Sequence, residues 1–174
     1  MLRRLVGSEM CIRDSLKGVP AFYLPALLAS ENDIKSFSMT GQRRDLNREK
    51  FKLDNLVSVL NNPESNANKN IKYLGNAMDI RSKLEQFHPS SEMECLSKGR
   101  SDIVVIKRGK GPKSVFAIHN MTENKINYQL DDYDLPELID NDFNMKDFLA
   151  STKYNWKNIS LDPFQVIWLG SLMK

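Results

Sequence analysis

The feature that most constrains this chain is a short apolar run at Val19–Leu24, followed by a long stretch without clear periodicity. Gly18 opens the run and Pro25 closes it, and Pro20 lies near its start, where a missing backbone donor is tolerated. Continuous apolarity over this length is typical of a parallel strand that is buried on both faces. The run therefore predicts a strand of a larger parallel sheet.

The stretch from Ala26 to Phe51 carries the densest charge in the chain. A connection of this length in a compact domain is usually functional or disordered. Within it we expect only a short helical turn, at Ala26–Ala29. Its second half reads TGQRRDLNREKF and places these charged residues close together: Arg43, Arg44, Asp45, Arg48, Glu49 and Lys50. From composition alone, a solvated charged turn is the simpler interpretation.

Length and composition indicate a soluble globular chain. Its 174 residues suit one ordinary domain, or a small domain joined to part of a larger one. With 41% hydrophobic residues and no apolar run of about 20 residues, a membrane protein is not expected. The net charge of +3 is spread along the chain, which disfavours nucleic-acid binding. Cys11 and Cys95 lie far apart without nearby metal ligands, which favours a reducing, cytoplasmic location.

The first fifteen residues, MLRRLVGSEMCIRDS, show no coherent period. Their 7–15 segment resembles a translated sequencing-adapter read. A secretory signal is disfavoured because the apolar region at Leu5 and Val6 is too short. We therefore expect residues 1–15 to be an unstructured artefact and the natural protein to extend further upstream.

Two helices are expected after the charged stretch. Asp54 can cap a short helix that runs through Leu60 and ends at Asn61–Pro63. The strongest amphipathic pattern runs from Ile71 to Phe87, and His88-Pro89 ends it because a residue before proline avoids the helical region. A position at a helix C-terminus favours the cationic form of this histidine, so we expect a structural role for it.

Past residue 89 the pattern changes to short strands. Asp102–Arg108 and Ser114–His119 flank a glycine-rich turn and predict a hairpin. The turn lacks the spacing of a phosphate-binding glycine loop. Lys125–Leu130 predicts a third strand. Phe164–Leu169 predicts the last one, in which Phe164 and Trp168 are expected to cover the core.

The acidic stretch 131–147 lacks the ligand spacing of a calcium-binding EF-hand loop. We expect it to be a solvated loop that binds no metal. The triplets that begin at Asn120 and Asn158 match glycosylation sites, but a cytoplasmic chain has no use for them.

Several segments together resemble the sucrose phosphorylase group of glycoside hydrolase family 13. Residues 18–51 resemble that group's eighth barrel strand and its following loop, where an RDINR-like motif stands here as Arg44-Asp45-Leu46-Asn47-Arg48. The resemblance continues through Phe87-His88-Pro89 to LDPFQVIWL at 161–169, and so covers essentially everything after residue 15. The sequence departs from the group's pattern at Pro25, Ala26 and Arg43. These departures affect the expected substrate preference.

The resemblance implies an α+β fragment of a larger enzyme. Residues 16–88 would form the last β/α unit of a (β/α)8 TIM barrel. Residues 89–174 would form a small antiparallel β domain. In such barrels the loops at the C-terminal ends of the strands build the active site, so the charged loop is the expected site.

The resemblance also implies that the parent enzyme is a glycosyltransferase of the α-amylase family, which transfers glucose to inorganic phosphate with retention. Its two carboxylates would lie on earlier strands, so we expect no catalytic residue here and no activity in the fragment. Arg44, with Arg43 beside it, would contact the sugar substrate or phosphate. Asp45 and Arg48 would hold the loop through an ion pair. The resemblance implies no cofactor, metal, membrane or nucleic acid, and it is compatible with a homodimer.

Two alternatives remain open. A hydrolase or transglucosylase of the same family would use the same carboxylates but would not need the loop cation. A non-catalytic carbohydrate-binding β domain would need an exposed aromatic platform, for which Tyr154, Trp156 and Trp168 are the candidates.

Overall fold

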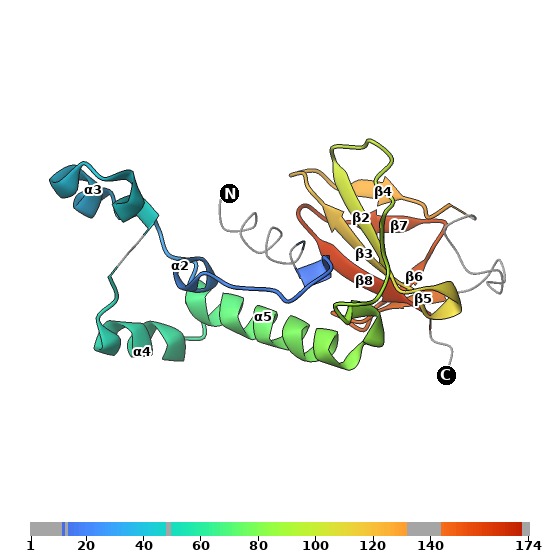
Figure 1. The fold of residues 1–174 in the computed structure, drawn as a ribbon, viewed down its shortest axis with the longest axis horizontal. Helices are drawn as coiled ribbons and strands as arrows, with labels where there is room; N and C mark the ends of the chain where they lie inside the picture. The colour runs from blue at the N-terminus through green and yellow to red at the C-terminus, as the bar shows by residue number, and fades with distance from the viewer. Residues whose placement is uncertain (1–11, 13, 48–49, 132–143, 172–174) are drawn as a thin grey trace. The chain divides into compact units, whose positions relative to one another are not determined.

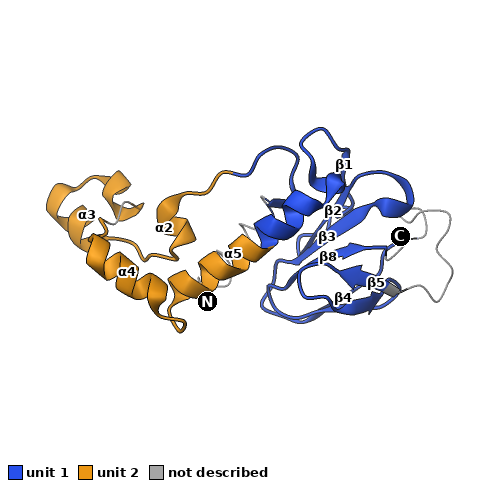
Figure 2. Cartoon of the chain, turned by 90° about the horizontal axis from the view of Figure 1, so that it is seen from below, with its two compact units in different colours: residues 1–20, 77–174 blue, residues 21–76 orange. Residues whose placement is uncertain are grey.

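The computed structural model describes residues 12, 14–47, 50–131 and 144–171. The chain divides into two compact units, one formed by residues 21–76 and the other by residues 1–20 and 77–174 (Figure 2). This division falls within a helix and not at the expected limit of 88–89, and the assignment of residues 16–88 to a barrel stays a prediction. Among the described residues, no helix combines the length and apolarity that a membrane crossing requires.

The unit of residues 21–76 is helical (Figure 1). It contains α2 (Leu24–Leu27), α3 (Ile34–Thr40), the 3-10 helix η1 (Arg43–Asn47), α4 (Leu53–Asn61) and the first part of α5 (Asn66–Lys83). The short turn expected at 26–29 corresponds to α2, two residues earlier. Helix α3 and η1 were not expected, so the stretch 26–51 contains more regular structure than its sequence pattern indicated.

The expected strand at Val19–Leu24 is wrong for this chain. Tyr23 is the N-cap of α2, Leu24 is its first residue, and residues 19–22 do not belong to a strand. Val19 is 83% exposed. A strand needs a hydrogen-bonded neighbouring strand, and neither sheet of the described residues includes this run.

Both expected helices form, but with different limits. Lys52 is the N-cap of α4, while Asp54 lies in the first turn, where its charge complements the helix N-terminus. Helix α5 begins earlier than expected because the Ser65 hydroxyl accepts the Asn68 N–H at 3.1 Å, which is an N-capping bond. It ends at Lys83, and a 3-10 turn, η2 (Glu85–Phe87), continues to the expected stop at His88.

The second unit contains an antiparallel sheet of six strands in the order β1-β2-β3-β8-β5-β6, so the expected antiparallel sheet is confirmed. A separate two-stranded sheet pairs β4 with β7. The strands are β1 (Met93–Cys95), β2 (Ile103–Arg108), β3 (Val115–Asn120), β4 (Ile126–Tyr128), β5 (Asn144–Asp147), β6 (Lys153–Asn155), β7 (Ile159–Leu161) and β8 (Val166–Gly170). The hairpin is confirmed, since β2 pairs with β3 from Ile103↔Asn120 to Arg108↔Val115. The turn between them holds a short 3-10 helix, η3 (Gly111–Lys113).

Strand β3 lies at the centre of the core, and all six of its residues are buried. Phe116 and Ile118 face one apolar cluster, while Val115 and Ala117 face a second cluster on the opposite side of the sheet. In the second cluster Phe87 packs against Trp168, with ring centroids 4.6 Å apart. Burial of Trp168 is thereby confirmed, whereas Phe164 precedes β8 and is only half-buried.

The acidic stretch is not a loop throughout. Residues 132–143 lie outside the described part of the chain, but Asn144–Asp147 forms β5, and the Asp147 side chain is buried. Its carboxylate accepts backbone N–H groups from Trp168, Leu149 and Ala150 at 2.9, 3.0 and 3.2 Å. These bonds make burial of a charged residue tolerable.

Residues 1–15 are not wholly unstructured, because Asp14 and Ser15 are helical and buried. Two arginines hold their backbone. The guanidinium of Arg81 donates to the carbonyl of Asp14 at 2.9 Å. The buried guanidinium of Arg108 donates to the carbonyls of Gln86, His88 and Ser15 at 3.1, 2.9 and 3.5 Å.

Candidate functional site

The candidate site is a pocket of about 390 Å³ within the unit of residues 21–76. Its lining comes from α3, from η1 and from the segment after η1: Ser36, Met39, Thr40, Arg44, Asp45 and Lys50. The two short helices are joined by a backbone bond from the N–H of Asp33 to the carbonyl of Leu46 at 2.8 Å. The pocket therefore belongs to the charged stretch that the sequence singled out.

Local sequence signals explain why α3 forms one wall. Asp33 caps its N-terminus, with its carboxylate accepting the N–H of Ser36 at 2.9 Å. Gly41 ends the helix in the left-handed conformation, at φ 68°, which glycine adopts without steric cost. The last residue of the helix, Thr40, then hydrogen-bonds through its hydroxyl to the carboxylate of Asp45. This bond ties the end of α3 to η1.

The charges in the pocket are two cations, Arg44 and Lys50, and one carboxylate, Asp45. Among the residues that the structure describes, neither cation takes part in an ion pair. Nearby, hydrogen bonds from Ser36 hold the pKa of the half-buried Asp33 below its usual value, and the charges of Lys35 and Lys50 contribute less. The pocket thus offers two exposed cations in a frame of hydrogen-bonded side chains.

Only some of the site residues expected from the sequence line the pocket. Arg44 and Asp45 line the pocket, whereas Arg43 lies in η1 without lining it. Arg48 lies outside the described residues, so its ion pair with Asp45 stays a prediction, as do the binding roles of Arg43 and Arg44. Sequence reasoning missed the pocket-lining hydroxyl residues and Lys50. The spacing of a capping Asp33 and a terminating Gly41 was the signal that would have placed α3 against the charged motif.

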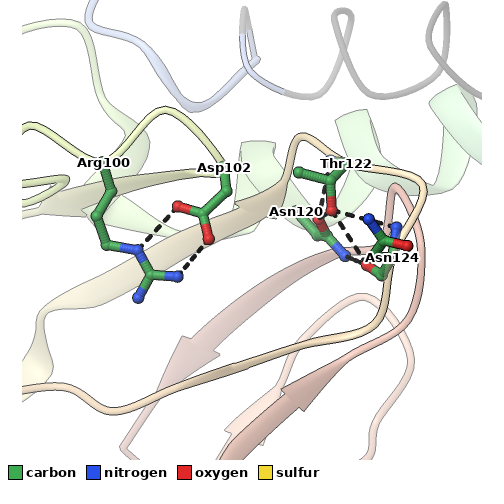
Figure 3. Close-up of polar contacts among 5 residues, drawn as sticks. All are labelled: Arg100, Asp102, Asn120, Thr122 and Asn124. Atoms are coloured by element: carbon green, nitrogen blue, oxygen red, sulfur yellow. Dashed lines mark hydrogen bonds and ion pairs between the residues drawn. The ribbon is translucent and has the colours of Figure 1, made fainter.

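Two further polar groups lie before the start of strand β2 and at the end of strand β3 (Figure 3). Arg100 and Asp102 form a two-pronged pair, with Nε to Oδ1 at 2.8 Å. The buried Asn120 accepts the N–H of Thr122 at 2.9 Å and donates to the carbonyl of Asn124 at 2.7 Å. The side-chain amide of Asn120 is thus hydrogen-bonded through both its oxygen and its nitrogen. The group around Asn120 therefore holds the turn that follows β3. The folded chain offers no glycosylation acceptor there.

The structure contradicts the carbohydrate-binding alternative that depended on an exposed aromatic platform. Trp156 is 2% exposed and Trp168 is fully buried. Tyr154 is half-buried, and its hydroxyl accepts a hydrogen bond from the side chain of Gln165 at 3.1 Å. The two tryptophan rings fill the interior, so these three residues do not form an aromatic platform at the surface.

The fold is shared with parts of several larger solved structures. The crystal structure of AmyP in complex with maltose matches with a TM-score of 0.72 and 15% identity, over 99% of this chain and 36% of that one. Bacillus licheniformis trehalose-6-phosphate hydrolase matches with a TM-score of 0.67 and 15% identity, over 97% and 39%. An Anoxybacillus α-amylase matches with a TM-score of 0.66 and 17% identity, over 98% and 33%. At such identities the likeness shows the fold alone.

Sequence similarity points to more particular relatives. Glucosylglycerate phosphorylase from Allomeiothermus silvanus is 32% identical over 109 residues, which cover 63% of this chain and 19% of the relative. The protein of the same name from Escherichia coli is 21% identical over 155 residues, which cover 89% and 26%. The chain therefore spans about a fifth to a quarter of the length of these curated relatives. No protein-family model matches the chain.

Proposed function

We propose that this chain is the C-terminal part of a retaining α-glucoside phosphorylase in the sucrose phosphorylase group of glycoside hydrolase family 13. Three relatives that carry the name glucosylglycerate phosphorylase support this assignment. The fold that the chain shares with AmyP and with trehalose-6-phosphate hydrolase supports the same broader family. The parent enzyme would transfer glucose from a small glucoside to inorganic phosphate in the cytoplasm.

In this proposal the bond-breaking chemistry belongs to parts of the parent outside this chain. One carboxylate attacks the anomeric carbon and displaces the leaving group, which a second carboxyl group protonates. The resulting glucosyl ester is then attacked by phosphate, with the second carboxylate accepting a proton from it. This chain alone would therefore have no activity, and its contribution would be to binding.

The observation that carries the proposal is the placement of Arg44 in a pocket without a neutralising ion pair among the described residues. A guanidinium presents several N–H donors in a rigid plane that matches the oxygens of phosphate. Asp45 lies beside it but is hydrogen-bonded to Thr40. Arg44 is thus the side chain that we propose to contact phosphate or the sugar substrate.

A hydrolase or transglucosylase of the same family is the second candidate. The structural neighbours favour it to the extent that they include trehalose-6-phosphate hydrolase and a trehalulose synthase. Such an enzyme would use the same pair of carboxylates, but its acceptor would be water or a sugar hydroxyl. Because neither acceptor is charged, it would not need a cation in this loop.

The test compares two acceptors in the full-length parent. Arg44→Ala should slow glucosyl transfer to phosphate far more than transfer to water, because only phosphate carries charge for the guanidinium to meet. Loss of one charge-assisted contact costs about 1.5–3 kcal/mol, or roughly ten- to a hundredfold. Arg48→Ala is the comparison variant and should affect both acceptors evenly through loop order. Equal losses with Arg44→Ala would favour the hydrolase or transglucosylase.

A further inference from the structure

We infer that Lys50 is the second cation of the candidate pocket and that it binds, together with Arg44, an oxyanion of the substrates, an inference that rests on the proposed function. The sequence interpretation gave this part to Arg43. The pocket, however, is lined by Lys50 and Arg44, and Arg43 is not among its lining residues.

Lys50 approaches the site from the chain segment after η1, whereas Arg44 comes from η1 itself. Both side chains are exposed, and within the described part of the chain neither forms an ion pair. Both side chains line one pocket from different segments of the chain. Because each carries a positive charge, the arrangement favours a negatively charged ligand.

The carboxylates near the cations are already engaged by other donors. Asp45 hydrogen-bonds the hydroxyl of Thr40. Asp33 accepts both the N–H and the hydroxyl of Ser36, at 2.9 and 2.5 Å. The charge of Lys50 is a minor influence on the pKa of Asp33 compared with these hydrogen bonds. Neither carboxylate therefore takes up the ammonium group of Lys50.

The hydroxyl groups in the lining are not free donors for a ligand. The hydroxyl of Ser36 donates to Asp33, and the single proton of Thr40 is shared between Asp45 and the carbonyl of Ser36. The donors that remain for a ligand are the N–H groups of Arg44 and the three protons of Lys50. Both remaining donors are cationic, so the ligand that they match best is an oxyanion.

Two substrates of a glucoside phosphorylase would present such an oxyanion. Inorganic phosphate carries it in every member of the class. A carboxylate carries it when the leaving group is an acid such as glycerate, which the relatives' name contains. Both bind through the same donors, and direct titration with each anion distinguishes them.

The experiment measures dissociation constants of inorganic phosphate and of glycerate for the full-length parent by titration calorimetry. Lys50→Gln should weaken binding of at least one anion about ten- to a hundredfold. Lys50→Arg should retain binding within about threefold, because it keeps the charge. The matched control is Lys35→Gln, which removes another exposed cation that does not line the pocket and should change binding by less than about threefold.

The anion that responds to Lys50→Gln identifies the source of the oxyanion. Equal, small effects of Lys50→Gln and Lys35→Gln on both anions would overturn the assignment, and so would a parent that binds neither anion. A different result would contradict the proposed function while leaving the anion site intact. If phosphate binding depends on Lys50 but the parent transfers no glucose to phosphate, the anion site stands and the phosphorylase assignment does not.

Discussion

The carboxylate of Asp147 accepts the backbone N–H of Trp168 at 2.9 Å in the interior of the sheet. The same carboxylate also accepts the N–H groups of Leu149 and Ala150, so it closes the turn that follows β5 and joins it to β8. Burial raises the pKa of Asp147, while the three hydrogen bonds act in the opposite direction.

Asp147→Ala should destabilise the sheet unit by about 2–4 kcal/mol, because it leaves buried N–H groups without an acceptor. Asp147→Asn should cost less, since its oxygen can still accept from Trp168 and Leu149. Urea unfolding followed by tryptophan fluorescence gives both values. A loss below about 0.5 kcal/mol for the alanine variant would show that the network does not stabilise the fold.

His119 should make the sheet unit sensitive to acid. Burial lowers its pKa from 6.5 to about 3. The unfolded chain therefore binds a proton between these values that the folded chain does not, and stability falls as pH drops below about 6.5. The slope for one group is about 1.4 kcal/mol per pH unit, so unfolding at pH 4.5 should cost roughly 2–3 kcal/mol less than at pH 6.5.

His119→Gln should remove most of this dependence on pH. The matched control is His88→Gln, which removes an exposed histidine instead of a buried one. Unfolding free energies between pH 7 and 4.5 provide the comparison. If the slope persists in the His119 variant, other groups are responsible for it.

Gly170 lies where strand β8 approaches a phenylalanine ring. A methyl group at this position would meet Cε2 of Phe148 at 2.4 Å, which is closer than atoms can pack. Gly170→Ala should therefore cost about 1–3 kcal/mol of stability. Gly75→Ala is the control, since its methyl group meets nothing within 4 Å. Because alanine has the higher helix propensity, this variant should gain about 0.5–1 kcal/mol of stability. Thermal unfolding distinguishes the two, and Phe148→Leu should restore part of the loss at Gly170.

The unit of residues 21–76 exposes large apolar side chains, among them Met39 at 79%, Leu53 at 73% and Ile34 at 67%. We predict that these side chains pack against a further part of the parent enzyme. The chain produced alone should therefore bind a hydrophobic dye and catalyse no phosphorolysis. Dye fluorescence and a phosphorolysis assay check the two statements, and measurable activity would mean that catalytic groups lie in this chain.

The sequence predicted the β strands better than the helical unit, for physical reasons. The hairpin around Gly109 and the burial of Trp168 follow from local patterns of apolar residues and turn residues, which the antiparallel sheet satisfies within this chain. The apolar run at Val19–Leu24 predicted a strand, but this run belongs to neither sheet of the described residues. Asp147 was assigned to a solvated loop because its neighbours in sequence are acidic, and only the fold brings it beside Trp168.

The candidate site was recognisable from the sequence only in part. The motif around Arg44 stood out through its charge and its resemblance to a known group. Lys50 and Thr40 could not be assigned, because their place in the pocket depends on α3 turning back at Gly41. A seven-residue helix leaves too weak a periodicity to detect, although its capping residues are visible.

The buried guanidinium of Arg108 also bears on the order in which the sheet unit assembles. It binds carbonyls at Ser15, Gln86 and His88, and the first of these lies 93 residues away in sequence. A cation of this kind cannot leave water until those carbonyls have arrived, because an uncompensated buried charge is costly. Contacts between residues so distant in sequence slow the search for the native state. The end of β2 should therefore lock late in refolding, after the hairpin itself has formed.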